Sequence, residues 1–177
     1  MRFKIAIAAL AATAAFATPA AAQVITDSET AEARGTVLLP LSVTNDAPLD
    51  FGTVMASATA GWVEVDAEDG SRSSDGVGVT LVALQPGGRG EFTVTATAGQ
   101  IVDLTVTPPV GNVLNGPAGN QVTISDFRLD NVVGLTDSRT MGAGGTLVVG
   151  VGGRFDIAAN QANGVYTADF SLTAEYN

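Results

Sequence analysis

Apolar and polar residues alternate along much of the chain, most clearly at its C-terminal end. Between Tyr166 and Tyr176 every second residue is apolar or aromatic, and polar or acidic residues fill the positions between them. A period of two places the two sets of side chains on opposite faces of a β-strand. The pattern therefore predicts a C-terminal strand with one face in the core. The turn-forming dipeptide Asn163-Gly164 precedes it, so we expect a strand over 154–158 to pair with it or pack nearby.

Similar short runs recur upstream, with turn signals about every ten residues. In 91–107 the break at Ala98-Gly99 predicts a hairpin, and in 121–129 a change of register at Ser125-Asp126 predicts a β-bulge. No segment shows a convincing helical period. The pattern predicts an all-β protein, an antiparallel, immunoglobulin-like or pilin-like β-sandwich of about eight to ten short strands. The expected strands cover residues 36–44, 49–54, 61–66, 77–84, 91–97, 100–107, 121–129, 146–151, 154–158 and 166–176.

The first 22 residues have the pattern of a secretory signal peptide. A short basic start is followed by an apolar run over 5–17 and by Ala20-Ala21-Ala22, a small-residue cleavage site. The apolar run is too short to span a bilayer. We therefore expect export by the Sec route to the periplasm, cell surface or exterior, with no transmembrane segment after cleavage. The remaining chain divides into a polar N-terminal extension, 23–35, and one β-sandwich domain, 36–177.

The expected mature chain is acidic and lacks several reactive residue types. The full chain has 8 basic and 18 acidic residues, and Arg2 and Lys4 leave with the signal peptide, so the formal charge becomes 6 minus 18, or −12. Such a surface disfavours nucleic acid as a partner. Residues 23–177 contain no His, Cys or Lys, which excludes the usual nucleophile–base pairs, most zinc sites and disulfides. No spacing selects a carboxylate pair for glycoside hydrolysis. We expect no enzyme activity and no cofactor.

An acidic loop supplies the best candidate metal ligands. Asp66, Glu68, Asp69 and Asp75 lie within ten residues of one another among Gly and Ser. Carboxylate oxygens are the ligands that calcium prefers, although the spacing does not match an EF-hand. The four residues are weak calcium candidates, and a solvated loop at one end of the sandwich is the favoured interpretation.

The only tryptophan, Trp62, is a candidate contact residue. In the expected strand over 61–66 it shares a face with Glu64 and Asp66, whereas Val63 and Val65 lie on the opposite face. A tryptophan among carboxylates is at least partly exposed, so Trp62 is a candidate platform for a sugar or a protein partner. The alternative is a residue of the core.

Three segments carry a resemblance to known proteins: 49–54 with the strand before it, 145–153 leading to Asn160-Gln161, and 164–176. On these segments the chain resembles an uncharacterised family of small secreted alphaproteobacterial domains, a domain of unknown function. It is also similar to the spore coat protein U group and to chaperone-usher pilins. The resemblance implies a sandwich domain of the cell envelope. In the chaperone-usher route an incomplete sandwich accepts the N-terminal extension of a neighbouring subunit as an added strand.

The main hypothesis is a non-enzymatic cell-surface or periplasmic structural protein, a pilin-like or coat-like fimbrial subunit that self-assembles by strand addition. Its expected partners are copies of itself or a periplasmic assembly chaperone. Candidate contact residues are Val37, Leu39, Leu41 and Val43, because 34–43 suits a donor strand better than 23–33, although it also fits the domain's own sheet. The alternative is a monomeric secreted module that binds a glycan or calcium through Trp62 and the acidic loop.

Overall fold

The computed structural model describes residues 26–177, so the expected signal peptide lies outside the described residues. Residues 26–36 are exposed and form neither helix nor strand. This segment contains four charged residues and no large apolar side chain, so it has little apolar surface to bury. The folded unit comprises Val37–Asn177.

Within residues 26–177 the regular structure consists of β-strands and two short 3₁₀ turns. The strands are β1 (Ser42–Ala47), β2 (Val54–Ala56), β3 (Gly61–Val65), β4 (Arg72–Ser74), β5 (Val79–Leu81), β6 (Gly90–Thr95), β7 (Ile101–Thr107), β8 (Val113–Asn115), β9 (Gln121–Leu129), β10 (Thr136–Thr140), β11 (Thr146–Ile157) and β12 (Ser171–Tyr176). The 3₁₀ turns are η1 (Val110–Asn112) and η2 (Pro117–Gly119).

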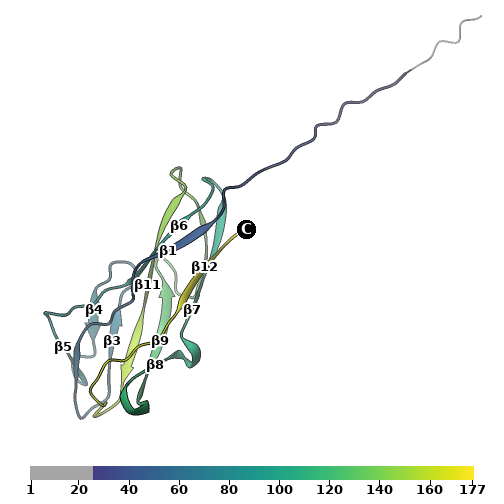
Figure 1. Cartoon of the computed structure of the whole chain (residues 1–177). Coiled ribbons are helices and arrows are strands. Elements are labelled where there is room, and N and C mark those ends of the chain that lie inside the picture. Colours follow the sequence, from purple (N-terminus) through teal and green to yellow (C-terminus); the bar gives the residue numbers. More distant parts are fainter. Residues whose placement is uncertain (1–25) are drawn as a thin grey trace, which may run out of the picture. The chain divides into compact units, whose positions relative to one another are not determined.

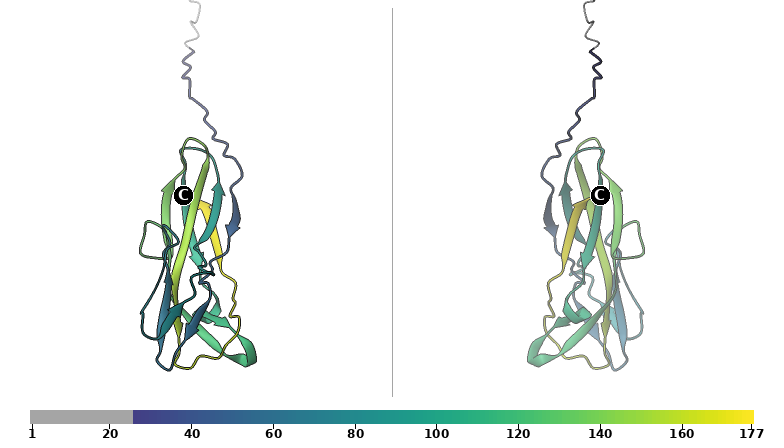
Figure 2. Two further views of the ribbon diagram at one scale, coloured as in Figure 1. Left: turned by 90° about the vertical axis from the view of Figure 1, so that its left-hand side faces the viewer. Right: turned by 90° about the vertical axis from the view of Figure 1, so that its right-hand side faces the viewer.

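The strands form two main sheets with a shared core. The larger sheet has seven strands: it runs β1-β6-β11-β3-β4, and β9 pairs with both β11 and β8. The second sheet has the order β10-β7-β12, and β2 pairs separately with β5. Every pairing is antiparallel. In Figure 1 β7 and β12 lie toward one side of the domain and β3, β4 and β5 toward the other, and Figure 2 shows the long strands from two further sides. The predicted antiparallel β-sandwich is confirmed.

The longest strand, β11, holds the larger sheet together. Its first half pairs with β6, and from Val151 onward it pairs with β9 and β3. The sequence pattern predicts two strands here, divided at Gly152-Gly153, and that division is wrong. Both glycines are buried, and a Cβ on Gly152 would overlap the backbone of Val65 and Ala67. They therefore allow close packing inside a continuous strand.

The core consists of the inward-facing residues of both sheets. Along β7 the residues Val102, Leu104 and Val106 are buried, and the residues between them are exposed or half-buried. Burying each such side chain stabilises the fold by about 1.5–3 kcal/mol relative to leaving it in water. The largest side chains with almost no exposure are Leu104, Leu129, Met141, Val63, Val65, Val94, Val102, Val106, Val149 and Val151.

One local prediction is confirmed in detail. The β9–β11 ladder changes register between the pairs Gly152↔Arg128 and Arg154↔Ser125, so β9 carries one extra residue. Asp126 has φ of +51°, as expected inside a bulge. The bulge keeps Ile124 and Phe127 both facing the core although they are three positions apart, an odd spacing that would place them on opposite faces of a regular strand.

Two predicted pairings are wrong. β6 and β7 form no hairpin: β6 belongs to the seven-stranded sheet and β7 to the three-stranded sheet, so Ala98-Gly99 crosses from one layer to the other. β12 begins only at Ser171 and pairs with β7, so the first alternative for 154–158, pairing with the C-terminal strand, is wrong. The second alternative is packing nearby, and Phe155 and Tyr166 do line one and the same groove. Upstream of β12, Thr167 makes a single bridge with Asn115. Alternation identifies the buried face of a strand. Two consecutive strands show the same alternation whether they pair in one sheet or lie in two facing sheets, so alternation does not predict which strands pair.

Candidate functional site

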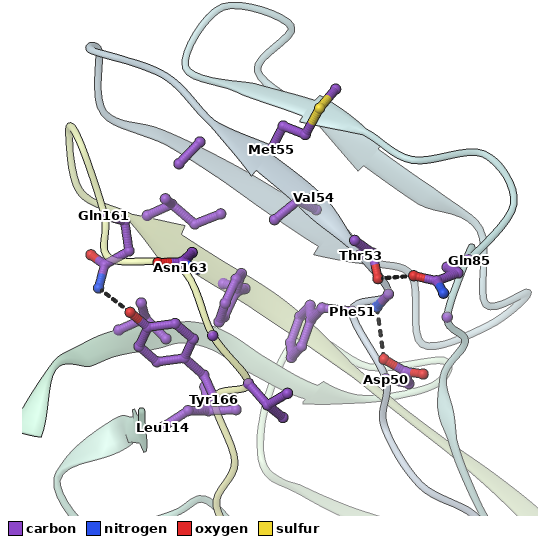
Figure 3. A pocket seen from close by; sticks show the side chains of 18 of the residues that line it. Asp50, Phe51, Thr53, Val54, Met55, Gln85, Leu114, Gln161, Asn163 and Tyr166 are labelled. Carbon is purple, nitrogen blue, oxygen red and sulfur yellow. Dashed lines mark hydrogen bonds between the residues drawn. The ribbon is translucent and has the colours of Figure 1, made fainter. Parts of the chain in front are cut away.

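The described residues form an open groove with a cavity volume of about 1170 Å³. One wall is the segment 49–56, which includes β2, together with 85–87. The opposite wall is the segment 161–166, which precedes β12. Figure 3 shows Phe51 and Val54 on the first wall and Tyr166 with Leu114 across from them. The groove therefore lies between the chain that follows β1 and the chain that precedes β12.

The floor of the groove is apolar. It is formed by Leu114 of β8, Val122 of β9, and Phe155 and Ile157 of β11. Phe51 stacks on Phe155, with ring centroids 5.2 Å apart. Of the 21 residues that line the groove, only one is charged, Asp50. In a chain with 18 acidic residues, an opening this large and this weakly charged favours an apolar partner.

Arg72 of β4 holds the first wall in place. Its Nη1 donates to the carbonyl oxygens of Phe51 (3.0 Å), Gln85 (3.1 Å) and Thr53 (3.2 Å). Its Nη2 donates to the carbonyl oxygen of Val82 at 2.8 Å. Arginine can do this because the guanidinium group presents several donors in a planar fork. One side chain thus connects the wall segments on both sides of β2 and β5 to the larger sheet.

Tyr166 fixes the second wall. Its hydroxyl donates to the carbonyl oxygen of Ala162 (2.6 Å) and accepts from Gln161 Nε2 (2.9 Å). The ring lies against the backbone at Gly116, where a Cβ would overlap its atoms. Gly116 is therefore required for this wall to close on the floor.

The backbone along both walls has free hydrogen-bonding capacity. β2 pairs with β5 along one edge only. Among the described residues, no backbone N–H or C=O between Asn163 and Tyr166 bonds to another backbone group. Unpaired edges beside an apolar floor are the features that an added β-strand uses.

The acidic-loop candidates do not converge. Asp66 accepts from the backbone N–H of Glu68 at 2.7 Å and Asp69 accepts from that of Ser71 at 2.7 Å. Asp75 accepts from that of Gly78 at 3.0 Å. Within residues 26–177 no group of three or more potential ligands could hold a metal ion. These carboxylates stabilise their own turns.

The same turn contacts perturb two of these acids. Hydrogen bonds from the backbone and side chain of Ser71 lower the pKa of Asp69 below its ordinary value of 3.8. The backbone N–H of Gly78 is the main cause that lowers the pKa of Asp75. Both groups therefore stay ionised to lower pH than a free aspartate.

Trp62 is half-buried on the outer face of β3, as its neighbours in the sequence predict, and Val63 and Val65 are buried on the other face. The guanidinium carbon of Arg154 lies 4.6 Å from the centroid of the Trp62 ring. This cation–π contact covers part of the surface on which a sugar would stack. On the same face Arg128 donates to Glu64 at 2.6 Å, and this hydrogen bond is the main cause that raises the pKa of Arg128.

The four candidate contact residues divide into two pairs. Leu41 and Val43 pack against the domain's own core, and Val43 is part of β1. Val37 is 96% exposed and Leu39 is 61% exposed. The backbone of Leu39 is nevertheless fixed, since its N–H donates to Thr97 Oγ1 (2.7 Å) and its carbonyl accepts from the Tyr176 hydroxyl (2.8 Å). The predicted strand over 36–44 is therefore displaced: β1 begins at Ser42.

Sequence reasoning identified the segment 49–54 but missed the groove and Arg72. The sequence predicts a polar loop around Arg72. No local pattern indicates that the Arg72 side chain reaches carbonyl groups 10 to 21 residues away along the chain. Within the described range no helix has the length and apolar character needed to cross a membrane.

The fold and the groove define an antiparallel β-sandwich domain with one open, weakly charged apolar groove between its N-terminal and C-terminal segments. The chain belongs to a family described as Domain of unknown function (DUF4402), whose model matches residues 41–176. The expected membership of an uncharacterised domain family is thereby confirmed. No curated protein and no solved structure matches the chain.

Proposed function

We propose that the chain is a non-enzymatic structural subunit of the cell envelope, pilin-like or coat-like, that self-assembles by strand addition at the groove. The observation that carries this proposal is the groove itself, with an apolar floor and two walls that have unpaired backbone. A strand inserted there would cover the groove above floor residues that already belong to the domain's core, and it would complete hydrogen bonds along the walls. The similarity to spore coat protein U and to chaperone-usher subunits, and export by the Sec route to the periplasm or cell surface, are parts of this proposal.

The alternative of a monomeric module for a glycan or calcium has less support. The ring of Trp62 is partly covered by Arg154. Asp66, Asp69 and Asp75 cap their own turns, and within residues 26–177 no group of three or more potential ligands could hold a metal ion. The groove is a better candidate for binding than either of these regions, because it is larger and nearly uncharged.

The experiment that tests the proposal is electrophoresis in SDS of the protein recovered from the envelope of its own host, with and without boiling. An inserted strand dissociates only when it is pulled out of a core, so assemblies should survive SDS at room temperature. We expect a series of bands that collapses to one band on boiling. A single monomer band in both lanes, from envelope and medium alike, would refute the proposal.

A further inference from the structure

The second wall of the groove carries an asparagine–glycine pair, Asn163-Gly164, in the segment that precedes β12. An asparagine followed by glycine loses its side-chain amide readily, because glycine has no side chain to hinder attack by its own backbone nitrogen. Both residues are exposed, and Asn163 lines the groove (Figure 3). The pair therefore combines a reactive sequence with access to water.

Three other pairs within residues 26–177 have an Asn-Gly or Asp-Gly sequence, and hydrogen bonds hold each of them. In Asn115-Gly116 the side-chain oxygen of Asn115 accepts from Gln121 Nε2 at 2.8 Å, and the N–H of Gly116 donates to the carbonyl oxygen of Asn120 at 2.8 Å. In Asp69-Gly70 and Asp75-Gly76 the carboxylate accepts from a backbone N–H two or three residues later, and the glycine N–H donates to an oxygen atom two to four residues earlier. In all three pairs the attacking nitrogen and the side chain are fixed.

Asn163-Gly164 differs from these three pairs. In the described part of the chain, neither the side-chain amide of Asn163 nor the N–H of Gly164 makes a hydrogen bond, although Tyr166 fixes the wall on both sides of them through Gln161 and Ala162. Rotation of the Asn163 side chain therefore brings its amide carbon to the Gly164 nitrogen without breaking a hydrogen bond. The fold leaves this one pair free to react and protects the other asparagine–glycine pair.

We propose that Asn163 is a site of spontaneous deamidation. The backbone nitrogen of Gly164 gives up its proton to hydroxide and attacks Cγ of Asn163. The new C–N bond closes a five-membered succinimide ring, and the side-chain nitrogen takes up a proton from water and leaves as ammonia. Water then opens the ring at either carbonyl, which gives aspartate or isoaspartate at position 163. The net change is one water consumed and one ammonia released, with no oxidation or reduction.

Both products place a carboxylate on the groove wall. Asp50 is the only charged residue that lines the unmodified groove, so deamidation adds a second negative charge. Isoaspartate also lengthens the main chain by one carbon atom next to Gly164, where a Cβ would lie 2.5 Å from Pro117 Cγ. The longer main chain has no room on the side of Pro117. Deamidation thus makes the groove less favourable for an apolar occupant.

One consequence concerns assembly and rests on the proposed function, whereas the reaction of the monomer does not. A strand inserted in the groove would bond to the free backbone of 163–166 and would hold Gly164 away from the Asn163 amide. The modification would therefore accumulate in copies that stay unassembled, and their grooves would become acidic.

Peptide mapping by mass spectrometry tests the proposal on the folded natural chain as a monomer in mildly alkaline buffer. Trypsin cleaves after arginine, so it places Asn163 in fragment 155–177 and Asn115 in fragment 90–128, and the second pair becomes an internal control. A digest at zero time gives the background. We expect aspartate and isoaspartate to accumulate at 163 about tenfold faster than at 115, because the hydrogen bonds of the Asn115 pair must open first. The rate should rise with pH, since the attacking nitrogen must lose its proton.

Two controls separate the effect of the fold from that of the sequence. In the urea-unfolded chain the two asparagine–glycine pairs should react at similar rates, because neither is held by hydrogen bonds. Asn163→Gln should largely stop the reaction in the folded chain, because its longer side chain would have to form a six-membered ring. Asn163→Asp should give the isoelectric shift of the fully modified chain from the start.

Equal rates at Asn163 and Asn115 in the folded chain, or an unmodified Asn163 after Asn115 has reacted, would overturn the proposal. These outcomes are distinct from a failure of the proposed function. A chain that never assembles but reacts selectively at Asn163 refutes the proposed function and supports deamidation. A chain that assembles, but whose monomer keeps the Asn163 amide, does the reverse.

Discussion

Replacement of Arg72 by alanine is the most direct test of how the groove is built. The substitution removes four hydrogen bonds to backbone carbonyl oxygens, whose donor–acceptor distances are 2.8–3.2 Å. Hydrogen bonds that involve a charged group contribute about 1.5–3 kcal/mol each. The sum is an upper bound, because Arg72 is half-buried and water can solvate the released carbonyls.

Three of the four acceptors also keep a backbone partner. Thr53, Gln85 and Val82 accept from the N–H groups of Val82, Thr53 and Gln85, respectively. Only the carbonyl oxygen of Phe51 has no other backbone donor. We therefore expect Arg72→Ala to lower the free energy of unfolding by about 2–4 kcal/mol, below the sum of the four bonds.

The measurement is urea unfolding of the monomer, followed by Trp62 fluorescence. Arg72→Lys should recover less than half of the loss, because an ammonium group cannot reproduce the planar fork. Arg34→Ala, in the exposed extension, is the matched control and should change the unfolding free energy by less than about 0.5 kcal/mol. A loss below about 0.5 kcal/mol for Arg72→Ala, or full recovery by lysine, would show that the guanidinium does not hold the wall.

Three further predictions concern single contacts. Tyr176→Phe removes the hydroxyl that bonds Leu39 and Thr97 and should cost about 1–3 kcal/mol in urea unfolding. Gly116→Ala places a methyl group in the space of the Tyr166 ring, so thermal unfolding should show a loss of about 1–3 kcal/mol from overpacking. Asp75 has a lowered pKa, so its ionised form stabilises the fold above pH 3.8, and this stabilisation is lost as the pH falls through the lowered pKa. Asp75→Asn should therefore flatten the fall in melting temperature between pH 5 and pH 3.

The Gly116 and Asp75 predictions each have a matched control. Gly134→Ala should be nearly neutral, since no atom lies within 4 Å of the added Cβ. Asp27→Asn, in the exposed extension, should leave the pH profile unchanged. Equal effects of Gly134→Ala and Gly116→Ala would contradict the packing argument, and an unaltered profile for Asp75→Asn would contradict the role of the turn contacts.

The class of fold and the buried face of each strand can be predicted from the order of the amino acids. Strict alternation placed Val63 and Val65 in the core and Trp62 outside it, and the slip at Ser125-Asp126 located the bulge. These features are local, because the direction of a side chain depends only on its position along its own strand.

The pairing of the strands, in contrast, depends on the folded arrangement of the whole domain. β6 and β7 lie in different layers, and β12 pairs with β7 across 64 residues or more of chain. The groove likewise arises between segments more than 100 residues apart, and Arg72 donates to carbonyls of two segments, 51–53 and 82–85, that are distant from each other in the sequence. Pairing and groove formation depend on how all the apolar faces pack together, and a period of two carries no information about which strand lies beside which. The sequence could therefore identify 34–43 as a candidate donor, but only the fold showed that Leu41 and Val43 belong to the domain's own core and that the exposed, alternating part ends at Leu39.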